Sequence, residues 1–394
     1  MLNSINIGTS GLTGFSKELQ TISNNVANLN TPSFKGSNAQ FSDLFAAGDN
    51  AGGDGNGGAR GASHSGYGLA TLPSVIDFSQ GQINQTGNDL DVAIDGEGFL
   101  VTHDDLGQTL YSRDGRLKFN QDELLVNQNG AKVQGLNAQG ALHDISLAGL
   151  HTNTASASTK ITLAGVLLNA DANKQITGIK VIDSAGGSHD LTIDLSTGTP
   201  ATAGTWQIAI KDGATTVGNG QVHFIDGRLD PAQADISFDY APANAKPMSL
   251  ALSFDPGVTS SATGNSTLAV SKIDGYGEGE LVKTTFDTLG KLVLSYSNGQ
   301  IVRQQTLALA HPGNNGDLEA VSGNSFRSRH PESITLGVAE VGKRSFNAES
   351  LEGSNVDLSK EFSAIIVTQR GYQAASELIS TANQMLDTLM HMKG

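Results

Sequence analysis

The feature that most constrains this chain is a seven-residue apolar repeat near each end. In the first 30 residues, the positions spaced alternately three and four apart are apolar, with one glycine among them: Ile5, Gly8, Leu12, Phe15, Leu19, Ile22, Val26 and Leu29. This spacing is the a/d seam of a helix that packs against another helix. The helix is weak on its own, because Gly8, Gly11 and Gly14 each cost about 1 kcal/mol relative to alanine. The pattern predicts a helix over residues 3–30 that forms when a partner covers its seam.

The expected partner lies at the other end of the chain. Five bulky residues recur every seven positions there, namely Leu358, Ile365, Tyr372, Ile379 and Leu386. Ala375, Ala382 and Leu389 follow the last three of them by three places. Ser354 or Asn355 can cap the start of a helix over residues 355–391, and Asp357 suits its first turn. Two such helices at opposite ends predict a terminal coiled coil with the rest of the chain looped out between them.

Short motifs accompany both helices. The N-terminal motif is NNVANLNTPSFK at residues 24–35, which includes Asn25, Asn28, Thr31, Pro32, Phe34 and Lys35. The C-terminal motif is SNVDLSKEF at residues 354–362 with QRGYQ at 369–373, which includes Asn355, Val356, Asp357, Gln369, Arg370 and Tyr372. Together they resemble the terminal signatures of bacterial flagellar rod, hook and hook-associated proteins. Ser33 departs from that pattern, which usually has glycine there. The alternative is an unrelated helical hairpin that carries heptads.

Composition narrows the possible functions. The formal net charge of −15 argues against binding to nucleic acid or to an anionic membrane surface. The chain has no cysteine, which excludes disulfides and thiolate sites. The sequence shows neither an 18-residue apolar run nor a secretory signal, so no membrane insertion is predicted. Composition alone would suggest a cytoplasmic protein, but the resemblance implies export through the flagellar type III apparatus without a cleaved signal.

The central part of the chain alternates short strands with turns. Residues 89–135 resemble the inner globular domain of rod and hook proteins, and residues 151–271 have the strand and turn spacing of a sandwich or barrel with Trp206 in its core. The predicted fold is a multidomain α+β chain in which a terminal coiled-coil domain is followed outward by two mainly antiparallel β domains. The predicted parts are a helical domain (1–45 and 355–394), a glycine-rich connector (46–70), an inner β domain (71–150 and 272–354) and an inserted outer β domain (151–271).

Three patterns invite a chemical interpretation and do not support one. The stretch from Gly337 to Lys343 has P-loop spacing, but Arg344 stands where a serine or threonine would hold Mg²⁺. Residues 95–98 lack the spaced carboxylates of a calcium loop. The His-Asp pairs at 103–104, 143–144 and 189–190 lie in separate β regions without a nucleophile motif. We therefore predict no enzymatic activity, no catalytic residue, no cofactor and no metal site.

The resemblance implies a structural subunit that assembles with copies of itself into the flagellar hook, a flexible tubular joint that transmits motor torque from the rod to the filament. The apolar positions of both seams form the predicted self-assembly interface. The implied partners are the rod, the hook cap, the hook–filament junction proteins, the length-control protein and the type III export apparatus, and the implied location is the extracellular hook. A distal rod subunit is the first alternative, although residues 151–271 favour the hook because rod proteins lack a large insertion. A surface ligand-binding module carried by that insertion is the second.

Overall fold

The structure is a computed structural model that describes residues 2–46, 65–169, 171–197, 204–233, 235–242, 245–340 and 343–392. Its contacts divide the chain into two compact units. Unit 1 comprises residues 1–148, 284–293 and 303–394, and unit 2 comprises residues 149–283 and 294–302. The chain passes from one unit to the other within β23 (Gly279–Phe286), β24 (Lys291–Tyr296) and β25 (Ile301–Leu307).

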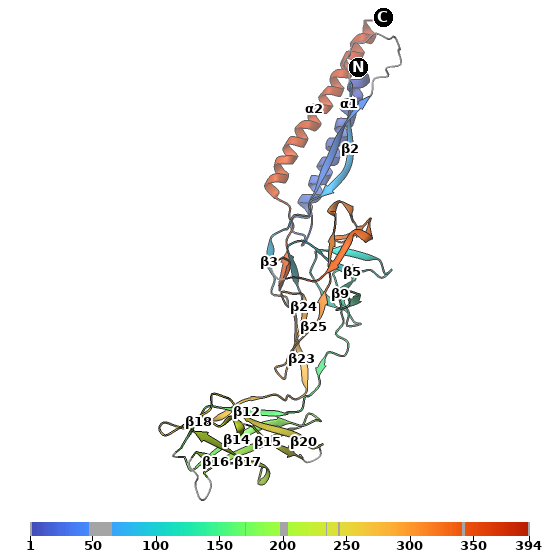
Figure 1. Cartoon of the computed structure of the whole chain (residues 1–394). Coiled ribbons are helices and arrows are strands. Elements are labelled where there is room, and N and C mark those ends of the chain that lie inside the picture. The colour runs from blue at the N-terminus through green and yellow to red at the C-terminus, as the bar shows by residue number, and fades with distance from the viewer. Residues whose placement is uncertain are drawn as a thin grey trace, which may run out of the picture. The chain divides into compact units, whose positions relative to one another are not determined.

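Two α-helices, α1 (Leu2–Ala27) and α2 (Leu358–His391), lie side by side in unit 1 (Figure 1). Helix α1 ends three residues before the predicted boundary, and turns follow it. Helix α2 begins at Leu358 because the Asp357 side chain accepts hydrogen bonds from the N–H groups of Ser359 and Lys360. Asp357 is thus the N-cap, and the prediction of Ser354 or Asn355 in that role was wrong. Among the described residues no helix is long and apolar enough to cross a membrane.

A two-stranded ribbon accompanies α1. Strand β1 (Ser37–Ala46) pairs antiparallel with β2 (Ser65–Ile76), and both strands contact the helix (Figure 1). The sequence pattern had placed residues 37–45 with the helices and residues 65–70 in the connector, but both segments are strand. Residues 47–64, the rest of the predicted flexible connector, lie outside the described residues.

The remainder of unit 1 is a β body built mostly of antiparallel pairs. Its strands are β3 (Ile83–Gln85), β4 (Val92–Asp95), β5 (Phe99–His103), β6 (Thr109–Ser112), β7 (Lys118–Phe119), β8 (Leu125–Val126), β9 (Lys132–Leu136), β10 (Leu142–Asp144), β26 (Leu309–Pro312), β27 (Leu318–Ala320), β28 (Ser325–Ser328), β29 (Ile334–Gly337), β30 (Ser345–Ala348) and β31 (Ser350–Glu352). Phe78, Phe99 and Phe326 meet edge to face in its core, with ring centroids 5.2–5.8 Å apart.

Residues 111–119 of this body contain an Asp-Gly pair flanked by apolar residues, a pattern that is typical of a hairpin turn between two strands. The structure pairs β6 with β5 and β28, and pairs β7 with β8, so β6 and β7 do not form a hairpin. Gly115 instead lies against β4, where its carbonyl accepts the N–H of Val92 at 3.0 Å. A side chain at this position would clash, because a Cβ atom would lie 1.6 Å from the Val92 carbonyl oxygen.

Unit 2 contains a four-stranded and a seven-stranded sheet whose orders are β19-β20-β12-β22 and β13-β21-β18-β17-β16-β15-β14. Its strands are β11 (Thr152–Asn153), β12 (Lys160–Ala164), β13 (Val166–Leu168), β14 (Asn173–Ile182), β15 (Ser188–Ser196), β16 (Thr205–Asp212), β17 (Thr215–Ile225), β18 (Arg228–Leu229), β19 (Asp235–Tyr240), β20 (Met248–Phe254), β21 (Thr259–Ser261) and β22 (Ala269–Ile273). One apolar core contains side chains from both sheets. Trp206 is buried in it, which confirms the prediction of a core aromatic.

Candidate functional site: the terminal helix pair and its junction

Helices α1 and α2 approach each other closely at glycines. A Cβ atom on Gly8 would lie 2.6 Å from Cγ1 of Ile379, and one on Gly371 would lie 2.6 Å from Cζ of Phe15. Each glycine therefore leaves the space that a side chain of the other helix occupies. The glycines that weaken α1 as an isolated helix are thus positions of contact with its partner.

The ribbon covers another side of α1. A Cβ atom on Gly14 would meet Leu69 Cδ2 at 2.5 Å and Phe41 Cε1 at 3.4 Å. The backbone N–H of Leu69 also donates to the Ser10 hydroxyl at 3.1 Å. Helix α1 is consequently covered by α2 and by the ribbon within a single chain.

The predicted seam residues are buried to different extents. On α1, Ile22 is buried, and the other apolar seam positions are partly buried: Ile5, Leu12, Phe15, Leu19 and Val26. Leu29, in the turn after the helix, is also partly buried. On α2, Ile365, Ile379 and Leu386 are partly buried, whereas Leu358 and Tyr372 are exposed. The fully buried row of α2 keeps the seven-residue spacing but begins three places later, at Glu361, Thr368, Ala375 and Ala382.

Helix α2 also has large apolar side chains that remain exposed to solvent. Those exposed on it include Phe362, Ile366, Val367, Leu378, Met385, Leu389 and Met390. Val367, Leu378, Met385 and Leu389 are spaced 11, 7 and 4 residues apart, which places them on one side of the helix, and we call them the outer stripe. A cavity of about 380 Å³ next to the stripe is lined by Leu378, Ala382 and Met385 of α2 and by Ser4 of α1. Large exposed apolar patches are typical of surfaces that bind another protein.

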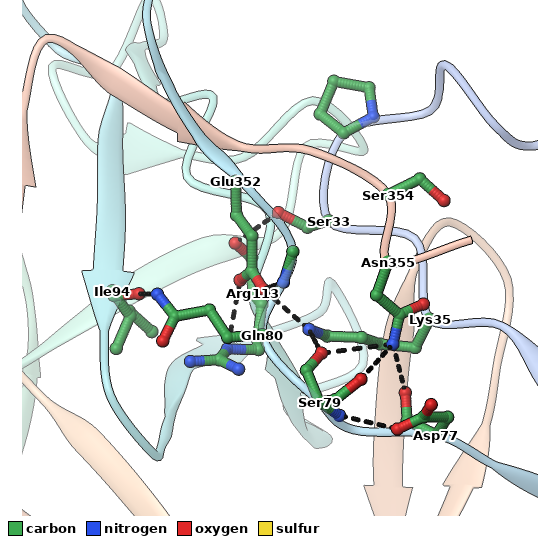
Figure 2. Close-up of polar contacts among 12 residues, drawn as sticks. Ser33, Lys35, Asp77, Ser79, Gln80, Ile94, Arg113, Glu352, Ser354 and Asn355 are labelled. Carbon is green, nitrogen blue, oxygen red and sulfur yellow. Dashed lines mark hydrogen bonds and ion pairs between the residues drawn. The ribbon is translucent and has the colours of Figure 1, made fainter. Parts of the chain in front are cut away.

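Below the helices, a buried ionic cluster joins both ends of the chain to the β body (Figure 2). Lys35 Nζ lies 2.7 Å from Glu352 Oε1, and Arg113 Nε lies 3.3 Å from Glu352 Oε2. Glu352 Oε1 also accepts the N–H of Gly81 at 2.7 Å. The Lys35 and Glu352 side chains are fully buried. Burial lowers the pKa of Lys35 below its usual 10.5, and the charge of Glu352 opposes that shift. We call Lys35, Arg113 and Glu352 the junction triad.

Two asparagines of the motifs complete the junction. Asn25 donates to the Ser37 carbonyl at 2.9 Å and to the Glu361 carboxylate at 3.1 Å. Asn355 accepts the N–H of Gly36 at 2.8 Å and donates to the Asp77 carbonyl at 2.8 Å (Figure 2). These bonds link the end of α1, the start of β1 and the start of α2.

The position where the resemblance expects glycine has a structural explanation. Ser33 has a φ of 57°, in the left-handed region that glycine adopts without strain. Its backbone N–H donates to the Glu352 carbonyl at 2.8 Å, and its buried hydroxyl donates to the Arg113 carbonyl at 2.7 Å. The serine therefore adds a hydrogen bond that glycine could not make.

The other motif residues fall into two groups. Those near the junction make local contacts. Thr31 donates to Asn28 Oδ1 at 3.1 Å, and the Pro32 carbonyl accepts from the Asn324 side chain at 2.9 Å. The Phe34 carbonyl accepts the N–H of Asn355 at 3.3 Å, and Val356 lies against Gly36. Gln369, Arg370 and Tyr372 are instead exposed on α2. One part of the signature therefore holds the junction, and the other lies on the surface of the helix.

Features of this site that sequence reasoning missed are Arg113, Glu352 and the outer stripe. The patterns that were set aside have structural roles. Gly337 ends β29, and residues 345–348 form strand β30 rather than the helix that a P-loop requires. Asp104 fixes a turn, and His189 bonds Asp183 at 2.8 Å rather than its neighbour Asp190. In the part of the chain that the structure describes, no group of three metal-ligating side chains is present.

The chain matches models of known protein families and is similar to known proteins. Three family models match: the Flagella basal body rod protein over residues 5–35, the Flagellar hook protein FlgE/F/G D1 domain over 93–184, and the Flagellar basal body rod FlgEFG protein C-terminal over 347–392. The flagellar hook protein FlgE of Escherichia coli (strain K12) is 30% identical over 98% of each chain. FlgE of Treponema pallidum (strain Nichols) is 29% identical over the full length of both. The crystal structure of Helicobacter pylori flagellar hook protein FlgE2 matches at 12% identity with a TM-score of 0.48, covering 67% of this chain and 99% of that chain.

Helices at both termini, a β-rich body and matches to rod and hook models at both ends define a structural protein of the flagellar rod and hook class. The full-length similarity to hook proteins then distinguishes a hook protein from a rod protein within that class. The chain belongs to the flagellar hook protein FlgE family.

Proposed function

We propose that the chain polymerises through the outer stripe of α2 and the adjoining groove beside α1, so that helix pairs from many copies form the inner wall of a tube. As a member of the hook protein family, the chain is a structural subunit of the flagellar hook. The observation that carries the proposal is the outer stripe, because covering one large apolar side chain is worth roughly 1.5–3 kcal/mol. In a polymer, a neighbouring copy would cover the outer stripe.

The domain arrangement is part of this proposal. Within residues 1–45 and 355–394, helices α1 and α2 form the helical wall as a coiled coil. The ribbon of β1 and β2, which takes up both ends of the proposed connector (residues 46–70), joins this wall to an inner β domain of residues 71–150 and 272–354. Residues 151–271 form an outer, sandwich-like domain. The contacts divide the chain only into units 1 and 2. The proposed helical domain and most of the proposed inner β domain share unit 1, whereas residues 149–150, 272–283 and 294–302 of the proposed inner β domain belong to unit 2. The junction triad and the two asparagines explain the shared unit, since they join the helices to the β body.

The hook acts as a flexible joint that passes torque from the rod to the filament, and this role follows from membership of the family. We further propose that the chain leaves the cell through the type III export apparatus and meets the rod, the hook cap, the junction proteins and the length-control protein. The distal rod alternative is disfavoured because the similarity to hook proteins spans 98% or more of both chains. No observation among the described residues of unit 2 favours a ligand-binding role for the insertion.

Electron microscopy of the purified chain tests the proposal. The chain is concentrated under salting-out conditions, with short native fragments as seeds. Curved tubes are the expected result, and straight tubes would favour the rod alternative. Monodisperse particles at every concentration and with every seed would contradict self-assembly.

A further inference from the structure

The turn between β5 and β6 presents an acidic and apolar tip. Asp104 Oδ1 accepts the N–H groups of Leu106 at 3.0 Å and Gln108 at 2.7 Å, and the Asp104 carbonyl accepts the N–H of Gly107 at 3.0 Å. These bonds fix the turn in one conformation. Leu106 is nevertheless 83% exposed, and Asp105 beside it is exposed with no ion-pair partner in the described chain. We call residues 104–107 the acidic tip.

A matching cavity lies elsewhere on the same sheet. Strand β27 is the last strand of the series β5-β6-β28-β27, and the loop after it, residues 321–324, lies beyond the Ser112 end of β6. The acidic tip lies beyond the Thr109 end of that strand. A cavity of about 360 Å³ along β27 and this loop has Leu318, Val321 and Phe326 in its lining. We call it the β27 cavity.

The charge around the β27 cavity complements that of the acidic tip. Arg329 and Glu319 line the cavity, and Arg327 of β28 does not. Arg327 and Arg329 lie 3.7 and 3.9 Å from the same Glu319 carboxylate, so one positive charge is left without a matching negative charge. Both arginine side chains are more than half exposed. The acidic tip carries two carboxylates, those of Asp104 and Asp105. Charges of opposite sign set the partner and the register of a contact.

Another cavity of unit 1 does not offer this match. It has a volume of about 480 Å³ and is lined by Arg113 and Arg344 together with Asp77 and Glu97. Two positive and two negative side chains give it no preference for an acidic group. The β27 cavity is therefore the better receptor for the acidic tip.

We propose that the acidic tip of one copy inserts Leu106 into the β27 cavity of a neighbouring copy, with Asp105 facing Arg327 and Arg329. The high exposure of Leu106 shows that it does not fill the cavity of its own chain. This inference rests on the proposed function, because polymerisation brings the copies together. The two surfaces are unlike, so the contact is heterologous and propagates from copy to copy instead of closing as a two-fold dimer. A helical tube requires contacts of that kind.

The absence of cysteine from the chain permits a direct test by cross-linking. A double variant, Leu106→Cys with Val321→Cys, is oxidised under polymerising conditions and run on a denaturing gel without reductant. We expect a ladder of covalent multimers that collapses to one band on reduction. The matched control combines Leu106→Cys with Val338→Cys, another exposed valine of unit 1, and should give no ladder beyond the pairs formed by single cysteines.

Parallel micrographs separate failure of this contact from failure of the proposed function. Tubes with a ladder support both. Tubes without a ladder overturn the tip contact and leave the hook-type assembly standing. A ladder from soluble chains that form no tubes supports the tip contact and contradicts assembly through the helices. If neither tubes nor a ladder form, the tip contact and the proposed function are both overturned.

A second variant measures the apolar part of the contact. Leu106→Ser removes the exposed leucine without adding a charge to the acidic tip and without touching the core of unit 1. We expect it to raise the critical concentration for polymerisation roughly tenfold, the effect of leaving one large apolar side chain uncovered. An unchanged critical concentration would contradict the insertion of Leu106 into a neighbour.

Discussion

A matched pair of glycine substitutions in α1 tests whether the helices meet through the spaces that glycines leave. Gly8 and Gly11 are three residues apart in the same helix, and both can be replaced by alanine. At Gly11 the new Cβ atom would lie 3.4 Å from Cβ of Ala375, an ordinary contact. At Gly8 it would lie 2.6 Å from Ile379 Cγ1 and 3.3 Å from the carbonyl oxygen of Ala375. Of the two substitutions, only Gly8→Ala requires Ile379 or helix α2 to shift.

The magnitudes follow from these distances. Alanine is about 1 kcal/mol more favourable than glycine in a helix interior, and both variants gain this amount. Overpacking a close contact costs about 1–3 kcal/mol, which only the Gly8 variant incurs. Gly11→Ala should therefore stabilise the helix pair by about 1 kcal/mol, whereas Gly8→Ala should be neutral or destabilise it by up to about 2 kcal/mol.

Circular dichroism at 222 nm during urea unfolding measures this difference. Within the described chain α1 and α2 are the only α-helices, so the helical signal reports on them. The midpoint of the helical transition should rise in Gly11→Ala and should not rise in Gly8→Ala. Equal stabilisation of both variants would refute the claim that Gly8 receives Ile379.

Two further predictions concern buried charge. Glu352→Gln should lower the free energy of unfolding by about 3–5 kcal/mol, because it leaves two buried cations without their carboxylate. The control Glu319→Gln removes an exposed carboxylate and should change it by less than about 1 kcal/mol. If Glu352→Gln and Glu319→Gln lowered the free energy of unfolding in urea equally, Glu352 would not stabilise the junction through buried ion pairs. In unit 2, the hydrogen bond from His189 holds the pKa of Asp183 below its usual 3.8. The Asp183 carboxylate therefore stabilises the folded state above pH 3.8, and this stabilisation is lost as the pH falls through the lowered pKa. Asp183→Asn should therefore weaken unit 2 at neutral pH and flatten its loss of stability below pH 3.8, and an unchanged acid limb would refute this.

The helices could be predicted because heptad spacing is a local signal. Both exist near the predicted boundaries. In the predicted seam of α2 the small residues Ala375 and Ala382 are buried, whereas the bulky residues of the seven-residue repeat are partly buried or exposed. The glycines of α1 indicated a weak helix, and the structure adds that they are contact positions.

The junction could not be derived from pattern in the same way. Lys35 and Glu352 are 317 residues apart, and no periodicity relates them. The motif resemblance singled out Lys35, Asn25 and Asn355 without indicating what they bind. Arg113 comes from the β body, and only the folded chain brings it to Glu352. The ribbon of β1 and β2 was missed because one strand directly follows the helix motif and the other begins in a glycine-rich stretch.

Charges placed on the outer stripe of α2 test whether this stripe is the assembly surface. A variant with Leu378→Asp and Met385→Asp places two charges on the stripe without touching the buried row of α2. The control, Ser376→Asp with Ser380→Asp, adds the same two charges at exposed polar positions on another side of the helix. Both variants should retain the helical signal of the unaltered chain.

The deciding measurement is sedimentation of each variant under the conditions that polymerise the unaltered chain. We expect the control to pellet as tubes and the stripe variant to stay in the supernatant as a folded monomer. If the stripe variant forms tubes at the same critical concentration as the control, the outer stripe is not the assembly surface.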